Sequence, residues 1–195
     1  MSMCYSQGLK MPFSRRLLIA LILSSMVPAT TIATEVQFAP DWTLSTPNGQ
    51  AINLADEAEK QTIVLFFWAT WCPYCKALMP HLQSIRIEYG DSVKILAINI
   101  FENADPVAFI NNAGYDFTLL LEGDAVAENY GIFGTPGLFV IDANRRIDVD
   151  IRTLPSLNPP NNGKKKSHAK RAAYLAPYWA AEVRKSIDRI ESAGR

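Results

Sequence analysis

Cysteine is scarce in this sequence of 195 residues, which contains only three. Cys72 and Cys75 are separated by two residues, and Cys4 stands apart near the N-terminus. Cys72 and Cys75 are too close together to join distant parts of a fold, and residues 34–195 contain no other cysteine, which excludes a domain stapled by disulfides over those residues. A zinc site is also disfavoured, because the sequence has no second Cys-x-x-Cys pair and only two histidines. We therefore predict that Cys72 and Cys75 form a reactive dithiol.

The sequence also lacks a hydrophobic run long enough to cross a bilayer, which takes about 20 residues. Its most apolar stretch, residues 17–27, follows Arg15 and Arg16 and precedes a series of small residues. This order of basic, apolar and small residues is typical of a secretory signal. We predict that residues 1–33 are a signal peptide removed on export to the periplasm or an equivalent compartment, with a retained membrane anchor as the alternative.

A net charge of either sign is absent, since 19 basic residues balance 19 acidic ones. The two signs are unevenly distributed: residues 34–151 carry 6 lysines and arginines against 16 aspartates and glutamates, whereas residues 152–195 carry 10 against 3. The basic part includes three consecutive lysines at residues 164–166, a run more typical of a solvated loop than of a nucleic-acid site. Export would also remove nucleic acid as a partner, so we expect none.

Alternating strand and helix patterns predict an α/β fold for residues 34–151. Residues 62–67 are β-branched and aromatic without polar alternation, as expected of a central strand buried on both faces. Apolar residues then recur at helical spacing over residues 73–89. The other predicted elements are helices over 53–59, 106–112 and 124–130 and strands over 93–99, 117–121, 137–141 and 146–151. Together they predict a mixed β-sheet sandwiched by helices.

The C-terminal part departs from this alternation. Residues 152–168 are basic and rich in proline, asparagine and glycine, which predicts a flexible loop. Residues 169–195 then show an apolar face at helical spacing. We predict a final helix that packs on the domain and is broken near Pro177, because proline disrupts a helix interior.

The placement of the two cysteines favours thiolate chemistry. The strand and helix patterns put Cys72 and Cys75 on the first turn of the helix that begins at Pro73. Backbone N–H groups without partners and the positive end of the helix dipole favour a thiolate at such a position. Proline suits the first helical residue, because its missing N–H is not needed there. The local pattern therefore predicts a redox-active dithiol.

Several motifs together resemble the thioredoxin superfamily, and more closely its exported TlpA/ResA/DsbE-like group of thiol-disulfide oxidoreductases. They are Phe67-Trp68-Ala69-Thr70, Trp71-Cys72-Pro73-Tyr74-Cys75-Lys76, Gly134-Thr135-Pro136 and, near the start of the body, Ala39-Pro40-Asp41-Trp42-Thr43-Leu44. The resemblance implies the thioredoxin-like fold with the strand and helix that this group inserts between residues 100 and 130. It implies no metal and no organic cofactor.

The resemblance also implies a role for each motif residue. Cys72 would be the exposed nucleophile and Cys75 the resolving thiol of a protein-disulfide reductase. Thr135 and Pro136, joined by a cis peptide bond, would lie beside the dithiol. Thr135 would present its backbone to an extended substrate segment. The implied substrate-binding residues are Trp71, Pro73, Tyr74, Thr135 and Pro136. The implied partners are proteins with disulfides or thiols and an exported or membrane-bound electron donor.

Two departures from the family pattern leave the substrate open. Reductases of this group that serve cytochrome c maturation commonly have an acidic residue three positions after the second cysteine, where this chain has Leu78. Thioredoxin has a buried aspartate six positions before its first cysteine, where this chain has Phe66. Neither a cytochrome c substrate nor a proton acceptor for Cys75 is therefore indicated.

A different class of function, a non-catalytic copper-binding or partner-docking module on the same fold, stays open at this point. Copper would need a third soft or imidazole ligand near the dithiol. His81 is the only candidate by sequence, but its spacing from Cys75 places it on another helical face. His168 follows the lysine run and is expected to be solvated, and Trp68 is expected to be a core residue.

Overall fold

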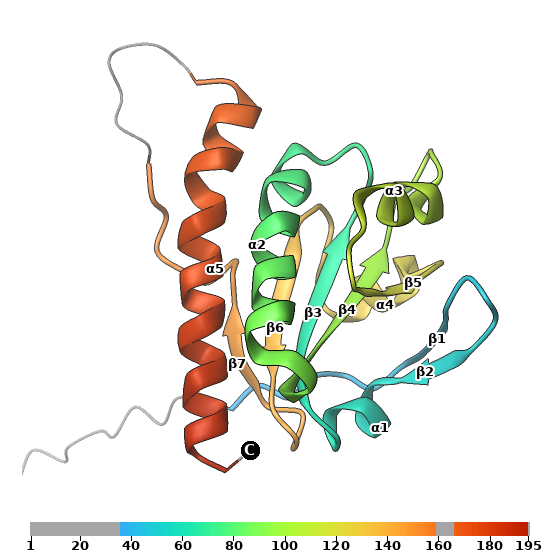
Figure 1. Cartoon of the computed structure of the whole chain (residues 1–195), viewed down its shortest axis with the longest axis vertical. Helices are drawn as coiled ribbons and strands as arrows, with labels where there is room; N and C mark the ends of the chain where they lie inside the picture. The colour runs from blue at the N-terminus through green and yellow to red at the C-terminus, as the bar shows by residue number, and fades with distance from the viewer. Residues whose placement is uncertain (1–35, 159–165, 195) are drawn as a thin grey trace, which may run out of the picture. The chain divides into compact units, whose positions relative to one another are not determined.

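The computed structural model describes residues 36–158 and 166–194 (Figure 1). The predicted signal peptide and part of the predicted basic loop lie outside these residues. Within the described ranges, no helix has the length and apolar character needed to span a membrane.

A five-stranded mixed sheet with the order β5-β4-β3-β6-β7 forms the centre of the fold. Its central strand β3 (Thr62–Trp68) is buried at every position, as its apolar sequence predicted. β3 pairs in parallel with β4 (Val93–Asn99) and antiparallel with β6 (Gly137–Ile141). The edge strands are β5 (Thr118–Leu120) and β7 (Ile147–Asp150).

The two faces of β3 support two separate cores, because successive side chains of a strand point to opposite faces. Val64, Phe66 and Trp68 pack with α2 (Pro73–Tyr89), α3 (Pro106–Ala113) and α5 (His168–Ser192). The opposite face packs with α1 (Leu54–Ala58), α4 (Asp124–Asn129) and a separate hairpin of β1 (Thr43–Ser45) and β2 (Ala51–Asn53). A 3₁₀ turn (Gly90–Ser92) connects α2 to β4. The result is the predicted α/β sandwich around a mixed sheet.

Local capping signals explain where the α3 helix begins and ends. The Asp105 side chain accepts a hydrogen bond from the Ala108 N–H at 2.9 Å, and Pro106 occupies the first turn. Gly114 ends the helix at φ +67°, a left-handed conformation that glycine adopts without strain. The sequence signals at both ends were therefore interpreted correctly.

The predicted break in the final helix is wrong, because α5 runs without interruption through Pro177 from His168 to Ser192. The helix lies beside α2 (Figure 1). A proline inside a helix costs about 3 kcal/mol, but α5 buries a complete face that offsets this cost. The buried residues are Ala172, Ala176, Ala180, Val183, Ser186, Ile187 and Ile190. Packing along this face maintains a helix that local propensity alone would break.

Candidate dithiol active site

The two cysteines lie where β3 gives way to α2, and they are joined as a disulfide. Cys72 is the N-cap residue of α2, with an extended backbone (φ −77°, ψ 112°), and Cys75 lies in the first helical turn. Their Cα atoms are 5.3 Å apart. The Cys75 backbone N–H donates to Cys72 Sγ at 3.1 Å. A donor aimed at Cys72 Sγ favours a thiolate on that sulfur rather than on Cys75.

The expected exposure of Cys72 is wrong in this disulfide form: 1% of its surface is accessible, against 0% for Cys75. Cys72 Sγ turns inward to bond with Cys75, and both cysteines join the core cluster that includes Trp68, Leu78 and Met79. Exposure therefore does not distinguish the two sulfurs. A partner can reach Cys72 Sγ only after neighbouring side chains move.

The loop before β6 reaches the same end of the sheet as the dithiol. Gly137 pairs with Phe67, so Pro136 lies beside the end of β3 that leads into the cysteines. The Thr135–Pro136 peptide bond is cis, as predicted. The Thr135 hydroxyl is buried and has no hydrogen-bond partner among the described residues. An unpaired buried hydroxyl is costly, so a polar group that reached it would be stabilised by a hydrogen bond.

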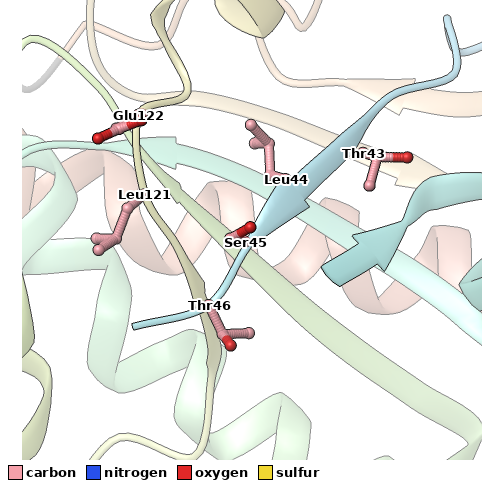
Figure 2. Close-up of a pocket in the computed structure, with 6 residues that line it drawn as sticks. All are labelled: Thr43, Leu44, Ser45, Thr46, Leu121 and Glu122. Atoms are coloured by element: carbon pink, nitrogen blue, oxygen red, sulfur yellow. The ribbon is translucent and has the colours of Figure 1, made fainter. Parts of the chain in front are cut away.

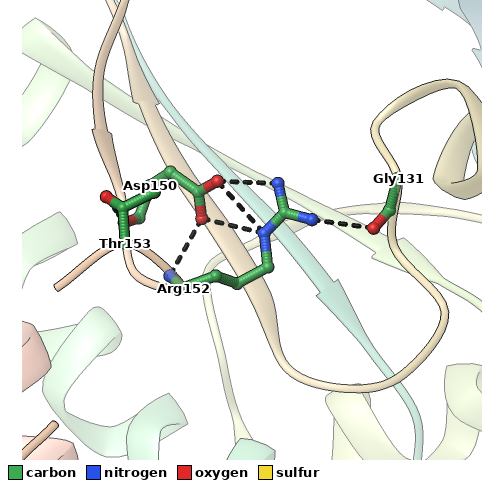
Figure 3. Close-up of polar contacts among 4 residues, drawn as sticks. All are labelled: Gly131, Asp150, Arg152 and Thr153. Carbon is green, nitrogen blue, oxygen red and sulfur yellow. Dashed lines mark hydrogen bonds and ion pairs between the residues drawn. The ribbon is translucent and has the colours of Figure 1, made fainter.

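Arg152, which the sequence did not single out, fixes the segment that leads into this loop (Figure 3). Its guanidinium donates to the Asp150 carboxylate through Nε at 2.9 Å and Nη2 at 2.6 Å, and to the Gly131 carbonyl through Nη1 at 2.7 Å. The same group lies over the Phe139 ring at 5.1 Å. Asp150 is buried, so the paired charges are partly shielded from water. The interaction ties the end of β7 to the chain just before the cis peptide bond.

The other side of the dithiol is held by the loop after β4. The Trp71 indole Nε1 donates to the Phe101 carbonyl at 2.8 Å, while about half of the Trp71 surface (48%) stays exposed. Glu102 accepts hydrogen bonds from the Thr70 N–H at 2.8 Å, the Thr70 hydroxyl at 2.7 Å and the Asn99 side-chain amide at 2.8 Å. Burial alone would raise the pKa of Glu102, but these bonds outweigh burial and lower its pKa to about 2. Glu102 thus connects Thr70, two residues before Cys72, to the loop after β4.

Glu102→Gln is expected to lower the free energy of unfolding near pH 7 by about 1–3 kcal/mol, because an amide cannot accept all of these bonds and turns an N–H toward other donors. A carboxylate whose pKa is lowered by folding contributes stability above its unfolded pKa, and this stability is lost as pH falls. The wild type should therefore lose stability relative to the variant between about pH 4.5 and pH 2. Urea unfolding at several pH values measures both effects.

Glu122→Gln, at an exposed nearby glutamate, is the control for this prediction. Equal pH profiles of stability for the wild type and Glu102→Gln would contradict this account.

Tyr74, between the two cysteines, contacts α5. Its hydroxyl lies 3.2 Å from His168 Nδ1, and the two rings meet edge to face with centroids 5.9 Å apart. Trp179 approaches the same ring at 6.3 Å. His168 is exposed, as expected of a solvated side chain. Its predicted place in the loop is wrong, because it is the first residue of α5, and it also contacts Tyr74 of the motif. Sequence gave no signal for this contact, since 94 residues separate the partners.

The positions of the missing family acids are filled by buried apolar side chains. Leu78 and Phe66 are both fully buried, and Trp68 is a core residue as predicted. Residues 36–158 and 166–194 contain no group of three or more His, Cys, Asp or Glu side chains placed to hold a metal ion. His81 and the dithiol therefore do not belong to such a group within these residues.

A shallow hollow lies at the edge of the sheet, beside the β1 strand (Figure 2). The Leu121 N–H donates to the Ser45 carbonyl at 3.2 Å and so joins the hairpin to the chain after β5. β4 and β5 separate this edge from β3 and the dithiol. The lining residues are Thr43, Leu44, Ser45, Thr46, Leu121 and Glu122. With hydroxyls and a single carboxylate, the hollow offers none of the dithiol chemistry.

Comparison with known proteins places the chain in a family. Residues 36–149, more than half of the chain, match the AhpC/TSA family. The thioredoxin-like protein YneN of Bacillus subtilis is 30% identical over 126 residues, which are 62% of this chain and 73% of YneN. The thiol-disulfide oxidoreductase ResA of Geobacillus thermodenitrificans is 33% identical over 112 residues, which are 56% of this chain and 64% of ResA. The chain therefore spans slightly less than two thirds of that ResA.

Solved structures agree with this placement. A Chlorobium tepidum protein assigned as the thiol:disulfide interchange protein DsbE is 25% identical, with a TM-score of 0.53 over 59% of this chain and 82% of that one. An uncharacterised conserved protein of Geobacillus kaustophilus, 20% identical, has a TM-score of 0.60 over 81% of this chain and 82% of that one, and shows the fold alone. The resemblance indicated by the motifs is confirmed. The chain is a thioredoxin-like member of the AhpC/TSA family and is similar to its thiol-disulfide oxidoreductases.

Proposed function

We propose that this protein is an exported oxidoreductase that reduces disulfides of protein substrates through Cys72 and Cys75. The observation that carries the proposal is the Cys72–Cys75 pair at the start of α2, with the Cys75 N–H directed at Cys72 Sγ. That donor and the helix dipole both favour the Cys72 thiolate, which is the reactive species in disulfide exchange. Similarity to ResA and to the DsbE-assigned structure supports the same chemistry.

The reaction proceeds in two exchanges. The Cys72 thiolate attacks one sulfur of the substrate disulfide, forms a mixed disulfide and releases the other substrate sulfur as a thiolate. Cys75, as a thiolate, then attacks Cys72 Sγ, forms the intramolecular disulfide and releases the second substrate sulfur. Two electrons pass to the substrate, whose two thiolates take up protons. The disulfide form described above is the product state of this cycle.

The residues around the dithiol supply the substrate-binding surface in this proposal. Trp71, Pro73 and Tyr74 come from the motif, and Trp71 presents a half-exposed indole next to Cys72. Thr135 and Pro136 come from the opposing loop, where an extended substrate segment would pair with backbone groups and approach the unpaired Thr135 hydroxyl. Phe133, which no sequence motif indicated, adds a highly exposed aromatic ring (82%) two residues before Thr135.

Export and recycling complete the proposal. Residues 1–33 carry the signal pattern, and the exported chain would then contain no cysteine except the dithiol. After each turnover the Cys72–Cys75 disulfide must be reduced again, so an exported or membrane-bound dithiol donor is required.

Two measurements on the protein beginning at residue 34 test this proposal. We expect catalysis of insulin reduction in the presence of dithiothreitol. Equilibration with glutathione should give a potential near the thioredoxin value of about −270 mV, rather than near the value of about −120 mV that is typical of strong oxidants. A value near −120 mV would overturn the direction of the reaction. Stoichiometric Cu(I) binding without any insulin reduction would instead favour the copper-binding module.

A further inference from the structure

In the first turn of α2, the Tyr74 ring contacts two side chains of α5. Tyr74 lies between His168 and Trp179, which are three turns apart on α5, with ring centroids at 5.9 Å and 6.3 Å. Beneath these two residues, on the same side of α5, Ala172 and Ala176 are buried. Small side chains there leave room for α2 to approach closely. Tyr74 is therefore partly buried against α5.

His168 contacts both the hydroxyl and the ring of Tyr74. Its Nδ1 lies 3.2 Å from the Tyr74 hydroxyl, and its ring meets the Tyr74 ring at 82°. The Ser167 side chain caps α5 by accepting from the Lys170 N–H, which fixes the start of the helix and so the position of His168. The histidine is thus held by α5 and in turn contacts the residue directly before Cys75.

This contact matters because the disulfide has almost no accessible surface. An attacking thiolate must approach Cys72 Sγ nearly in line with the S–S bond, so the first turn of α2 or its cover has to shift first. Tyr74 is covalently part of that turn. Any contact that holds Tyr74 on α5 therefore opposes movement of the first turn of α2.

We propose that His168 is a positioning residue that, through the Tyr74 hydroxyl, holds the first turn of α2 in the closed arrangement and slows attack on the Cys72–Cys75 disulfide. The proposal deepens the proposed function, on which its biological meaning rests, by assigning to α5 control over the reactivity of the dithiol. The long C-terminal helix then has a role in the site as well as in the core.

The test is the rate at which dithiothreitol reduces the oxidised protein, followed by tryptophan fluorescence. One dithiothreitol thiolate attacks Cys72 Sγ and releases the Cys75 thiolate. The second dithiothreitol thiolate then closes the cyclic disulfide of dithiothreitol and releases Cys72, so two electrons pass to the protein. His168→Ala and Tyr74→Phe should each raise the second-order rate constant about three- to tenfold, which is the range expected for loss of one such hydrogen bond. The double variant should be no faster than the faster single variant, because both changes remove the same contact.

Conservative and remote substitutions separate this role from a general loosening of the fold. His168→Asn, whose amide nitrogen or oxygen can reach the position of Nδ1, should restore a rate close to that of the wild type. His81→Ala, on the same helix as the dithiol, and Lys170→Ala, on the first turn of α5, should leave the rate unchanged. Rates for His168→Ala within 1.5-fold of the wild type, about the scatter of such assays, no rescue by asparagine, or additive effects of the two single changes would each overturn the proposal.

The outcome is independent of whether proteins are the substrates. The assay needs only the disulfide and a small thiol, so a changed rate in the His168 variants supports the positioning role even if insulin is not reduced. Conversely, insulin reduction with unchanged rates in these variants would support the proposed function and refute the positioning role.

Discussion

Replacing Cys72 by serine is expected to abolish insulin reduction, with the catalysed rate falling by about 10³-fold or more. A serine hydroxyl stays protonated at neutral pH and cannot form the mixed disulfide, so neither exchange can take place. The Cys75 N–H that now points at Cys72 Sγ would face a hydroxyl of similar position, and the fold should be kept. Insulin turbidity with dithiothreitol measures the loss, with circular dichroism as the check on folding.

Cys75→Ala should give a different defect, which separates the two cysteine roles. The Cys72 thiolate can still attack, but the mixed disulfide has no resolving thiol and should accumulate. Non-reducing electrophoresis and mass spectrometry after expression with residues 1–33 would detect and identify the trapped partners. The same Cys75→Ala variant expressed from residue 34 is the matched control, because it lacks Cys4, which could otherwise resolve the adduct. Retained insulin reduction by Cys72→Ser, or adducts on Cys75 in that variant, would contradict the assignment of the nucleophile.

The parts of the fold that could be predicted from sequence are those determined by neighbouring residues. β3 was recognisable because every residue after Thr62 is apolar, and α3 because Asp105, Pro106 and Gly114 mark its two ends. The prediction failed where distant contacts decide the structure. α5 continues through Pro177 because a whole helical face is buried, which the local penalty of a proline does not reveal.

The same distinction applies to the site. The dithiol and the cis Thr135–Pro136 bond could be predicted from motifs. The supporting residues could not, because Glu102 reaches Thr70 across 32 residues and His168 reaches Tyr74 across 94. A lone glutamate or histidine carries no pattern in one sequence. The burial of Cys72 was missed for a related reason, since its exposure depends on side chains from several elements.

Leu78 occupies the position at which reductases of the resembling group commonly have an acidic residue. The residue lies one helical turn after Cys75 and is fully buried in the core that surrounds the dithiol. A glutamate there would place an unpaired carboxylate in an apolar site. Ionised groups without a partner are poorly tolerated in such surroundings. The leucine thus fits the packing of this chain, and the family acid would not.

Leu78→Glu is therefore expected to lower the free energy of unfolding at pH 7 by about 3–5 kcal/mol, as measured by urea denaturation. Burial would raise the pKa of the new carboxyl above its unfolded value, so the folded state would bind the extra proton more readily. The deficit should then shrink as pH falls toward 4 and reach its full size only above the folded-state pKa. Leu78→Met, which keeps the volume and adds no charge, should cost less than about 1.5 kcal/mol at any pH. If the glutamate variant were as stable as the methionine variant at pH 7, the side chain at position 78 would have to reach water or a cationic partner. The family acid could then be accommodated beside this dithiol.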